Sequence, residues 1–551
     1  MIKKLLQLTA FLENNPLTAG LILLLFSIVF FSIMQSALVF PDPDSFYHTK
    51  MAVLMTEQGI IKDFNNLPFT IFQNYYIDHH FLYHVYLMPF VYFLPPLAGA
   101  KLGQTILTSL LILTFFWLLK KLKIKWAFWF TLLLFSAPAF VFRISLVKAQ
   151  PLSIIILLLG IYFILSKKYR SLFCLAFVYV WTYDGWFLLL IISMLYIFIN
   201  SWQLTTYHYH KKWLDNILTC IKLKKKTQIK NFIITWIKNC FSPDNLKLFS
   251  AVFLGLLAGI IFNPYFPQNL DFFYVHILKI GLLNFNNPIA VGAEWYPFTA
   301  WEFVKAMAII FIIFIISGMI FLNRWKKFGL ATKYLASIAF LFILSAVKSR
   351  RNIEYFIPMA VLFSATVFTA GFKIKEVRRD LQQIKKILYL KEIWSSRFLK
   401  YFLSAVIFTS LLAGIIGLAI TEKTSISSGY GLNYLQNASN FLQQNSQAGD
   451  IVFHNNWDEF PILFYNNNKN KYIIGLDPTF LYYQNPDLYY KWLDTINGKN
   501  PDEVYNIIKN DFQAKFVLIA KRNQKMLKNI ANNFYFTEIY DDNEATIYKV
   551  N

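Results

Sequence analysis

The chain has 551 residues, of which 56% are hydrophobic and only 15% are charged, so it is far more apolar than an average soluble domain. This composition excludes an ordinary soluble globular enzyme. The net charge of +23 would normally suggest a nucleic-acid partner. However, residues 1–421 hold 41 of the 53 basic residues but only 16 of the 30 acidic ones, and the long apolar runs lie in the same region. We therefore assign the excess charge to membrane loops and expect no nucleic-acid partner.

Eleven apolar runs, each near the length of a membrane span, predict a polytopic helical protein. They cover residues 17–39, 102–119, 126–142, 151–166, 171–183, 185–200, 249–263, 302–322, 334–347, 352–372 and 401–421. The first run is long enough to span a membrane and no small-residue cleavage site follows it, so we predict a retained helix rather than a signal peptide. Three prolines interrupt a further run at 83–97, where we predict a re-entrant or interfacial segment. The total is about 11 to 13 membrane helices.

Loops rich in Lys and Arg alternate along the chain with loops that contain few of them. The basic segments are 1–16, 120–125, 167–170, 201–248, 323–333 and 373–400, whereas 40–80, 143–150, 264–300 and 348–351 together hold eight Lys and Arg. The positive-inside rule places the basic loops in the cytoplasm. We therefore predict a multi-pass protein of a prokaryotic inner membrane, with a cytoplasmic N-terminus and an external C-terminal domain.

The composition turns polar from about residue 422 onward. Short apolar, β-rich runs at 451–453, 472–476 and 516–520 alternate there with helix-like stretches, and a hairpin-like segment closes the chain at 534–550. This pattern predicts a small extracytoplasmic α/β domain, 422–551. It follows a transmembrane domain, 1–421, which carries external loops at 40–100 and 264–300.

Two polar clusters in the first external loop are candidate metal or catalytic sites. Asp42 and Asp44 lie on a proline-stiffened turn and can converge on a divalent cation, or one of them can orient a nucleophile. The alternative is a solvated turn that caps a helix. Further on, a helix would place His80 and His84 one turn apart on one face, with Asp78 beside them, which is the spacing that two metal ligands need. Interfacial histidines without a metal are the alternative.

Cations gather at two other external positions. Arg143 and Lys148, in a short loop between two spans, suit a phosphate or a lipid headgroup, although a pair of snorkelling side chains would look the same. Lys348, Arg350 and Arg351 lie on the external side against the positive-inside trend, and an anionic substrate would explain them. The competing explanation is an internal ion pair between Arg350 or Arg351 and Glu354.

Glu294 is a nearly isolated acidic residue in the long loop 264–300, where it precedes Trp295, Tyr296 and Pro297. Gly292 provides flexibility just before it. A lone carboxylate among aromatic residues on a long loop is typical of a group that faces a substrate. We therefore include Glu294 among the candidate functional residues.

Taken in order, these motifs resemble the catalytic subunits of oligosaccharyltransferases and, more widely, the polytopic GT-C glycosyltransferases that use polyprenyl-linked sugars. Asp42-Pro43, followed by Tyr47-His48, is similar to the first-loop motif in which the Asp is catalytic. Glu294, before the run Pro-Phe-Thr-Ala-Trp, resembles the family's external-loop Glu. Arg351, followed by Tyr355 and Pro358, is placed like the arginine that contacts the lipid diphosphate. Asn456-Trp457-Asp458-Glu459-Phe460 sits where the family has Trp-Trp-Asp-Tyr-Gly.

The chain departs from the family pattern in two places. The family carries an acidic metal-binding pair in the second external loop, but this chain reads Lys148-Ala149-Gln150-Pro151 there. Either Mg²⁺ or Mn²⁺ is held differently, by Asp42 and Asp44 or by Asp78, His80 and His84, or no metal is used. Only Trp457 and Asp458 match the five-residue acceptor motif, so an Asn-x-Ser/Thr acceptor does not follow from the resemblance.

The resemblance implies transfer of a sugar or oligosaccharide from a polyprenyl phosphate or diphosphate to a protein, lipid or glycan acceptor on the extracytoplasmic face. The implied roles are catalysis by Asp42, Asp44 and Glu294, binding of the donor phosphate by Arg351, Arg350, Lys348 and Arg143, and binding of the acceptor by Trp457 and Asp458. Two alternatives stay open. A transporter or flippase of lipid-linked sugars would use similar groups, although the chain shows no internal repeat. A non-catalytic scaffold would fit the missing acidic pair, although Asp42 is present.

Overall fold

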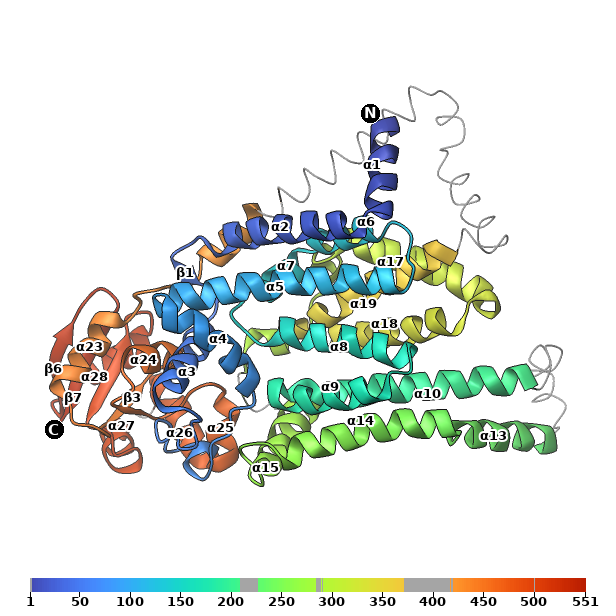
Figure 1. Ribbon diagram of the computed structural model, residues 1–551. Coiled ribbons are helices and arrows are strands. Elements are labelled where there is room, and N and C mark those ends of the chain that lie inside the picture. The colour runs from blue at the N-terminus through green and yellow to red at the C-terminus, as the bar shows by residue number, and fades with distance from the viewer. Residues whose placement is uncertain are drawn as a thin grey trace.

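The computed structural model describes residues 2–208, 226–283, 289, 291–370, 417, 420–499 and 501–551. Long helices of the N-terminal part run roughly alongside one another, and the C-terminal region covers one end of this bundle (Figure 1). The bundle and the two loops predicted to be external contain α1 (Ile2–Asn14), α2 (Pro16–Gln35), α3 (Asp44–Gln58), α4 (Phe81–Phe93), α5 (Pro96–Lys121), α6 (Ala127–Leu132), α7 (Pro138–Ser145), α8 (Gln150–Leu165), α9 (Tyr169–Thr182), α10 (Phe187–His208), α13 (Lys226–Cys240), α14 (Pro243–Ile261), α15 (Asn269–Phe273), α16 (Ala300–Lys305), α17 (Ala308–Arg324), α18 (Leu330–Lys348) and α19 (Ile353–Ala370).

Seven helices in the described residues are long and apolar enough to cross a membrane, or up to eight if one bent pair counts as a span. The bent pair joins α6 to α7 at 83° and replaces the straight span expected at 126–142. The break lies at Ala137, because the following Pro138 pushes its backbone into an extended conformation. The spans expected at 151–166 and 171–183 correspond to α8 and α9, which have 16 and 14 residues. The span expected at 401–421 lies almost wholly outside the described residues.

Prolines and a glycine set several helix boundaries. Pro16, Pro96 and Pro243 each stand at the start of a helix, where the missing N–H is tolerated. Pro96 starts α5 six residues before the expected span. The segment at 83–97 overlaps α4, whose 13 residues end at Phe93, two residues before Pro95. Gly59 ends α3 with a positive φ of 75°, a conformation that glycine adopts without strain.

The C-terminal region contains a five-stranded sheet, as its alternating apolar runs predict. The strand order is β4-β3-β5-β7-β6; β3 pairs in parallel with β4 and β5, and β7 pairs antiparallel with β5 and β6. The strands are β3 (Ile451–His454), β4 (Lys471–Tyr472), β5 (Phe516–Ala520), β6 (Phe536–Asp541) and β7 (Ala545–Val550), and the helices around them are α23 (Gln436–Asn445), α24 (Phe460–Asn466), α25 (Pro478–Gln484), α26 (Pro486–Ile496), α27 (Val504–Asn506) and α28 (Gln524–Ala531). The expected final hairpin is therefore confirmed as β6 and β7.

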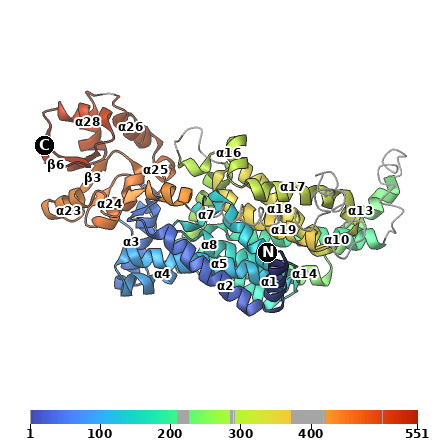
Figure 2. The ribbon, with the colours of Figure 1, turned by 90° about the horizontal axis from the view of Figure 1, so that it is seen from above.

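The first external loop packs directly against this C-terminal region. Strand β1 (Val39–Phe40) pairs antiparallel with β2 (Tyr430–Gly431). Helix α24 lies on α3, where the rings of Phe46 and Tyr465 are 5.8 Å apart, and the Asn66 side chain donates to the carbonyl oxygens of Asn468 and Asn470. These contacts place the turn after β1 against the C-terminal region, and Figure 2 shows α3 beside α24.

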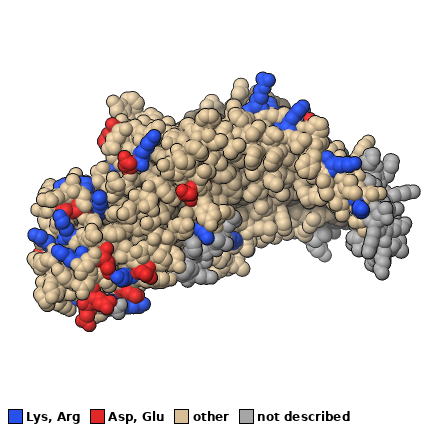
Figure 3. Space-filling view, turned by 90° about the horizontal axis from the view of Figure 1, so that it is seen from below, with Lys and Arg blue, Asp and Glu red and all other residues tan. Residues whose placement is uncertain are grey.

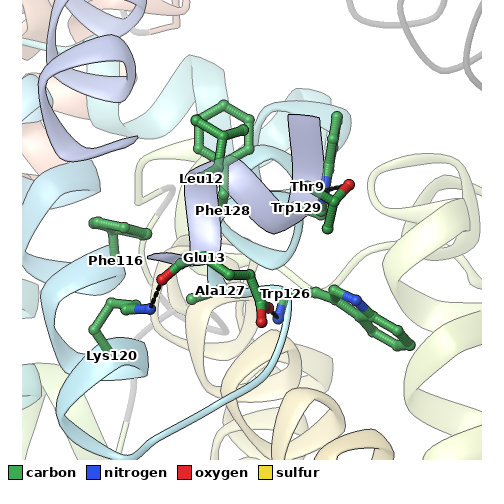
Figure 4. Close-up of a pocket in the computed structure, with 9 residues that line it drawn as sticks. All are labelled: Thr9, Leu12, Glu13, Phe116, Lys120, Trp126, Ala127, Phe128 and Trp129. Atoms are coloured by element: carbon green, nitrogen blue, oxygen red, sulfur yellow. Dashed lines mark hydrogen bonds between the residues drawn. The ribbon is translucent and has the colours of Figure 1, made fainter. Parts of the chain in front are cut away.

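Charged side chains gather over the C-terminal region, whereas much of the helical surface in the same view carries none (Figure 3). Such an uncharged surface suits contact with lipid. Near the N-terminus, the Glu13 carbonyl oxygen accepts a hydrogen bond from the Lys120 ammonium, and the Glu13 carboxylate accepts one from the Trp126 backbone N–H (Figure 4). The cavity there has a volume of only about 10 Å³, barely enough for one water, so it is too small for a substrate.

Candidate active site

A cavity of about 430 Å³ lies where the helix ends, the external loops and the C-terminal region meet. The charged and aromatic residues that line it come from motifs far apart in the sequence. They include Asp42, Asp44, His79, His80, Arg143, Lys148, Tyr183, Asp184, His276, Glu294, Arg351, Trp457 and Asp458. The structure thus brings most of the predicted site residues to one end of the bundle.

Lys148 stands between the two carboxylates of the first external loop. Its ammonium nitrogen lies 2.9 Å from Oδ2 of Asp42 and 2.7 Å from Oδ2 of Asp44. Asp42 also accepts a hydrogen bond of 2.5 Å from the Ser45 hydroxyl. Burial alone would lower the pKa of Lys148, but the two carboxylates raise it above its ordinary value. Burial raises the pKa of Asp44, against the opposing charge of Lys148. The lysine therefore stays charged and neutralises much of the negative charge of this pair.

The predicted divalent cation does not fit between Asp42 and Asp44 in this arrangement, because the Lys148 ammonium already lies between their oxygens. The other predicted ligands are separate from this pair. Both ring nitrogens of His84 are engaged, Nδ1 by Asp78 at 2.7 Å and Nε2 by His48 at 2.8 Å. Among the described residues, Asp78, His80 and His84 do not form a cluster of converging metal-ligating atoms.

Arg143 holds together two acidic residues from distant parts of the chain. Its Nη1 pairs with the Glu294 carboxylate, and its Nε donates to Oε2 of Glu354 at 2.8 Å. Glu354 is fully buried. The expected alternative in which Arg350 or Arg351 pairs with Glu354 is therefore corrected, since Arg143 takes this role. Burial would raise the pKa of Glu294, but Arg143, Lys148 and Arg351 lower it well below its ordinary value, so Glu294 is ionised.

Arg351 faces the cavity, whereas its neighbour Arg350 does not line it. The Arg351 guanidinium lies over the Trp295 ring at 4.3 Å, donates to the Tyr183 hydroxyl at 2.9 Å and approaches Glu294 only to 3.9 Å. Arg350 is more exposed and pairs with Glu302 at 3.0 Å. Of the three predicted phosphate-binding cations at 348–351, Arg351 is therefore the one in the main cavity.

A second cavity of about 290 Å³ adjoins the first, and Lys348 lines it. Tyr183, Asp184, His276 and Arg351 line both cavities. The other walls are mainly apolar and include Phe187, Leu188 and Ile191 of α10 and Leu341 and Phe342 of α18. A polar cavity next to an apolar one suits an amphipathic molecule.

Trp457 and Asp458 line the side of the main cavity that belongs to the C-terminal region. They lie in a short helical turn that the Asn456 side chain caps by accepting from the Asp458 backbone N–H. Burial, together with the negative charge of the nearby Asp44, raises the pKa of Asp458 to about 6. Gly292, on the loop that carries Glu294, lies beside the Trp457 ring. Of the two candidate acceptor residues, Trp457 therefore meets the loop that carries Glu294.

Sequence reasoning missed one cluster in the cavity wall. One nitrogen or carboxylate oxygen from each of His79, Asp184 and His276 lies within 4.8 Å of the other two. Among the described residues, no other three metal-ligating side chains come this close together. Their separation along the chain shows no ligand spacing. The only local signal is that each is a polar residue beside aromatic or apolar neighbours. This group could hold a divalent cation.

No family model matches the chain. No curated protein matches it either. Solved structures do match over nearly its whole length. An archaeal oligosaccharyltransferase, AglB from Archaeoglobus fulgidus in complex with an inhibitory peptide and a dolichol-phosphate, gives a TM-score of 0.60 at 11% identity, with 98% of this chain and 75% of that chain covered. ArnT from Cupriavidus metallidurans, bound to undecaprenyl phosphate, gives 0.51 at 10% identity, with 96% and 97% covered.

These neighbours are GT-C glycosyltransferases. The chain has the GT-C fold. A structure of an oligosaccharyltransferase from Archaeoglobus fulgidus in complex with Zn and sulfate also matches, with a TM-score of 0.55, 11% identity, and 96% of this chain and 73% of that chain covered. At such low identities the likeness concerns the GT-C fold alone. The assignment of individual residues to roles therefore rests on the geometry of the cavity.

Proposed function

We propose that the chain is a membrane glycosyltransferase that moves a sugar or oligosaccharide from a polyprenyl phosphate or diphosphate to an acceptor at the external membrane surface. The observation that carries this proposal is the meeting, in one cavity, of the partly buried carboxylates of Asp42 and Asp44 and an arginine that also borders an apolar cavity. The polar part provides groups for glycosyl transfer and the apolar part suits a lipid chain.

The lipid-linked donor would bind across the two cavities. Arg351 would contact the phosphate, because its guanidinium is preoriented by Trp295 and Tyr183 and is not fully occupied by Glu294. The first isoprene units would lie against the apolar side chains of α10 and α18. The dolichol-phosphate and undecaprenyl phosphate named with the two neighbours support this class of donor.

The reaction would break the bond between the sugar C1 and the phosphate oxygen and form a bond between C1 and the acceptor nucleophile. The bonding electrons leave with the phosphate oxygen, and Arg351 stabilises the resulting charge. Asp42 orients the nucleophile and accepts its proton. Ser45 and Lys148 hold the Asp42 carboxylate in position. No step requires a metal ion between Asp42 and Asp44.

The acceptor would enter on the side of Trp457 and Asp458. Glu294 approaches from the long loop and connects this side, through Arg143, to the buried Glu354. The acceptor is a protein, a lipid or a glycan. The alternation of basic loops supports an inner-membrane location with the N-terminus in the cytoplasm and the cavity outside. The proposed domain boundary at residue 421 follows the change in composition.

The neighbouring residues Arg350 and Arg351 provide a matched test of the proposed glycosyl transfer. We would compare glycans on secreted proteins and in lipid extracts, by mass spectrometry, from cells that carry the wild type, Asp42→Asn, Arg351→Ala or the control Arg350→Ala. Loss of Asp42 or Arg351 should reduce one glycan product by about 10²–10³-fold, since each would remove a group that acts in the transition state. The control Arg350→Ala should retain the product, because Arg350 lies outside the main cavity.

Equal glycan profiles in all four strains at equal membrane expression would contradict a transferase. In that case transport of lipid-linked sugars is tested next, by measuring whether a labelled lipid moves from one leaflet of a vesicle to the other. An inactive scaffold would change neither the glycan profile nor the sidedness.

A further inference from the structure

Three segments meet at the wall of the main cavity, away from Asp42 and Lys148. His79 lies in the loop before α4, Asp184 lies at the turn between α9 and α10, and His276 belongs to a π-helical segment, η4 (Tyr274–Leu283), in the long external loop. One ligand atom from each lies within 4.8 Å of the other two. Separate segments thus direct two imidazoles and a carboxylate at one point.

The contact between His276 and Asp184 is not an ordinary hydrogen bond. Nδ1 of His276 touches Oδ2 of Asp184, yet this buried nitrogen has no hydrogen-bond partner, because the required directions are not met. A buried polar atom without a partner is costly, so the arrangement calls for a further group. An imidazole nitrogen and a carboxylate oxygen that lie close together without hydrogen-bond geometry are compatible with two ligands of one metal ion.

Aromatic neighbours hold the two imidazoles in place. The His276 ring stacks on Phe272, with centroids 5.2 Å apart and planes 10° apart. The His79 ring lies 4.9 Å from the same Phe272 ring and 5.2 Å from His276. Ligands that are oriented by their packing lose little freedom when an ion binds.

We propose that His79, Asp184 and His276 bind a zinc-type divalent transition-metal ion that ties the long external loop to the helix ends at the cavity wall. Two imidazole nitrogens and one carboxylate oxygen are ligands that zinc accepts at such a site, whereas magnesium prefers oxygen ligands alone. Three protein ligands leave one coordination position open. All three residues line the main cavity, so an ion bound by them would lie at the cavity wall.

The site is distinct from the expected cation between Asp42 and Asp44. The proposed ion would hold the long loop 264–300, since His276 precedes Glu294 in that loop. Binding at this point would hold η4 against the turn at Asp184 and so restrict the loop that carries Glu294. The inference does not depend on glycosyl transfer.

The experiment measures metal in the purified full-length chain in detergent, after dialysis against metal-free buffer, by inductively coupled plasma mass spectrometry. The wild type should hold one zinc per chain. His276→Ala and Asp184→Asn should each lower the content roughly tenfold or more, because each removes a ligand. His454→Gln, which changes a buried histidine of the C-terminal region, is the matched control and should keep the zinc.

A wild type without bound metal, or equal zinc in all variants, would overturn the proposal. A second measurement, the addition of Co²⁺ to metal-free wild type, does not depend on whether the variants fold. The visible absorption of a four-coordinate Co²⁺ site, abolished by zinc, supports the proposal, and the spectrum of the hydrated ion contradicts it. Neither readout involves sugar transfer, so failure here and failure of the proposed function are separate results.

Discussion

The Lys148 ammonium lies 2.9 Å from a carboxylate oxygen of Asp42 and 2.7 Å from one of Asp44. In this chain a side-chain cation therefore stands between two carboxylates that would otherwise repel each other. Lys148 belongs to the loop in which the resemblance to oligosaccharyltransferases predicts an acidic metal-binding pair. The charge of the site is thus balanced by the protein itself.

Lys148→Ala should create a binding site for Mn²⁺, because it leaves two neighbouring carboxylates without their cation. Binding is measured by electron paramagnetic resonance of free Mn²⁺ added to the purified chain, relative to the wild type. Transfer of the glycan product should fall, since Asp42 loses the group that positions it.

The double variant Lys148→Ala/Asp44→Asn is the control for this prediction. It should lose the additional Mn²⁺ binding, because only one full carboxylate charge remains. If Lys148→Ala binds no more Mn²⁺ than the wild type, the two carboxylates do not form the expected cation position.

Arg143→Met should destabilise the chain by about 3–5 kcal/mol, because the fully buried Glu354 loses its cation. Arg143→Met/Glu354→Gln should recover much of this loss, since the uncompensated buried charge is gone. Heat-unfolding midpoints in detergent measure both effects. A double variant that is no more stable than the single one would show that the pairing of Arg143 with Glu354 does not matter for stability.

Titration of the buried Glu459 should make the stability of the chain depend on pH. Burial raises its pKa from 4.5 to about 7, despite the ion pair of 2.7 Å with Arg522. The folded chain therefore retains a proton that the unfolded chain has lost, and the free energy of unfolding should fall as the pH rises from about 4.5 to about 7. Glu459→Gln should flatten this slope, measured by unfolding midpoints across that range. An unchanged slope would assign the dependence to other groups.

Gly429→Ala should loosen the contact between the first external loop and the C-terminal region. A Cβ atom there would lie 2.1 Å from the Phe40 carbonyl oxygen, beside the pairing of β1 with β2. The expected loss of stability is about 1–3 kcal/mol. Gly431→Ala is the matched control, since a Cβ there meets no atom within 4 Å.

Heat unfolding and limited proteolysis between the two regions measure this effect. Faster cleavage should occur in Gly429→Ala alone. Equal cleavage of both variants would mean that the strand pair does not hold the two regions together.

Much of the architecture could be predicted from local pattern. Apolar length predicts the helices, and the alternation of basic loops predicts that Asp42, Arg143, Glu294 and Arg351 lie at one end, which the shared cavity bears out. Short apolar, β-rich runs predict the sheet of the C-terminal region. The bend at Pro138 was missed, because apolarity alone does not distinguish a straight span from a broken one.

The sequence by itself determined a helical membrane protein with its polar clusters gathered at one end, because helix length and charge placement are local properties of the chain. Only the tertiary structure decided which charges pair. Arg143 and Glu354 are 211 residues apart, and the adjacent Arg350 and Arg351 take different neighbours, since successive residues of a tight helical turn point in different directions. The grouping of His79, Asp184 and His276 likewise depends on the packing of three distant segments, a geometry that no spacing along the chain contains.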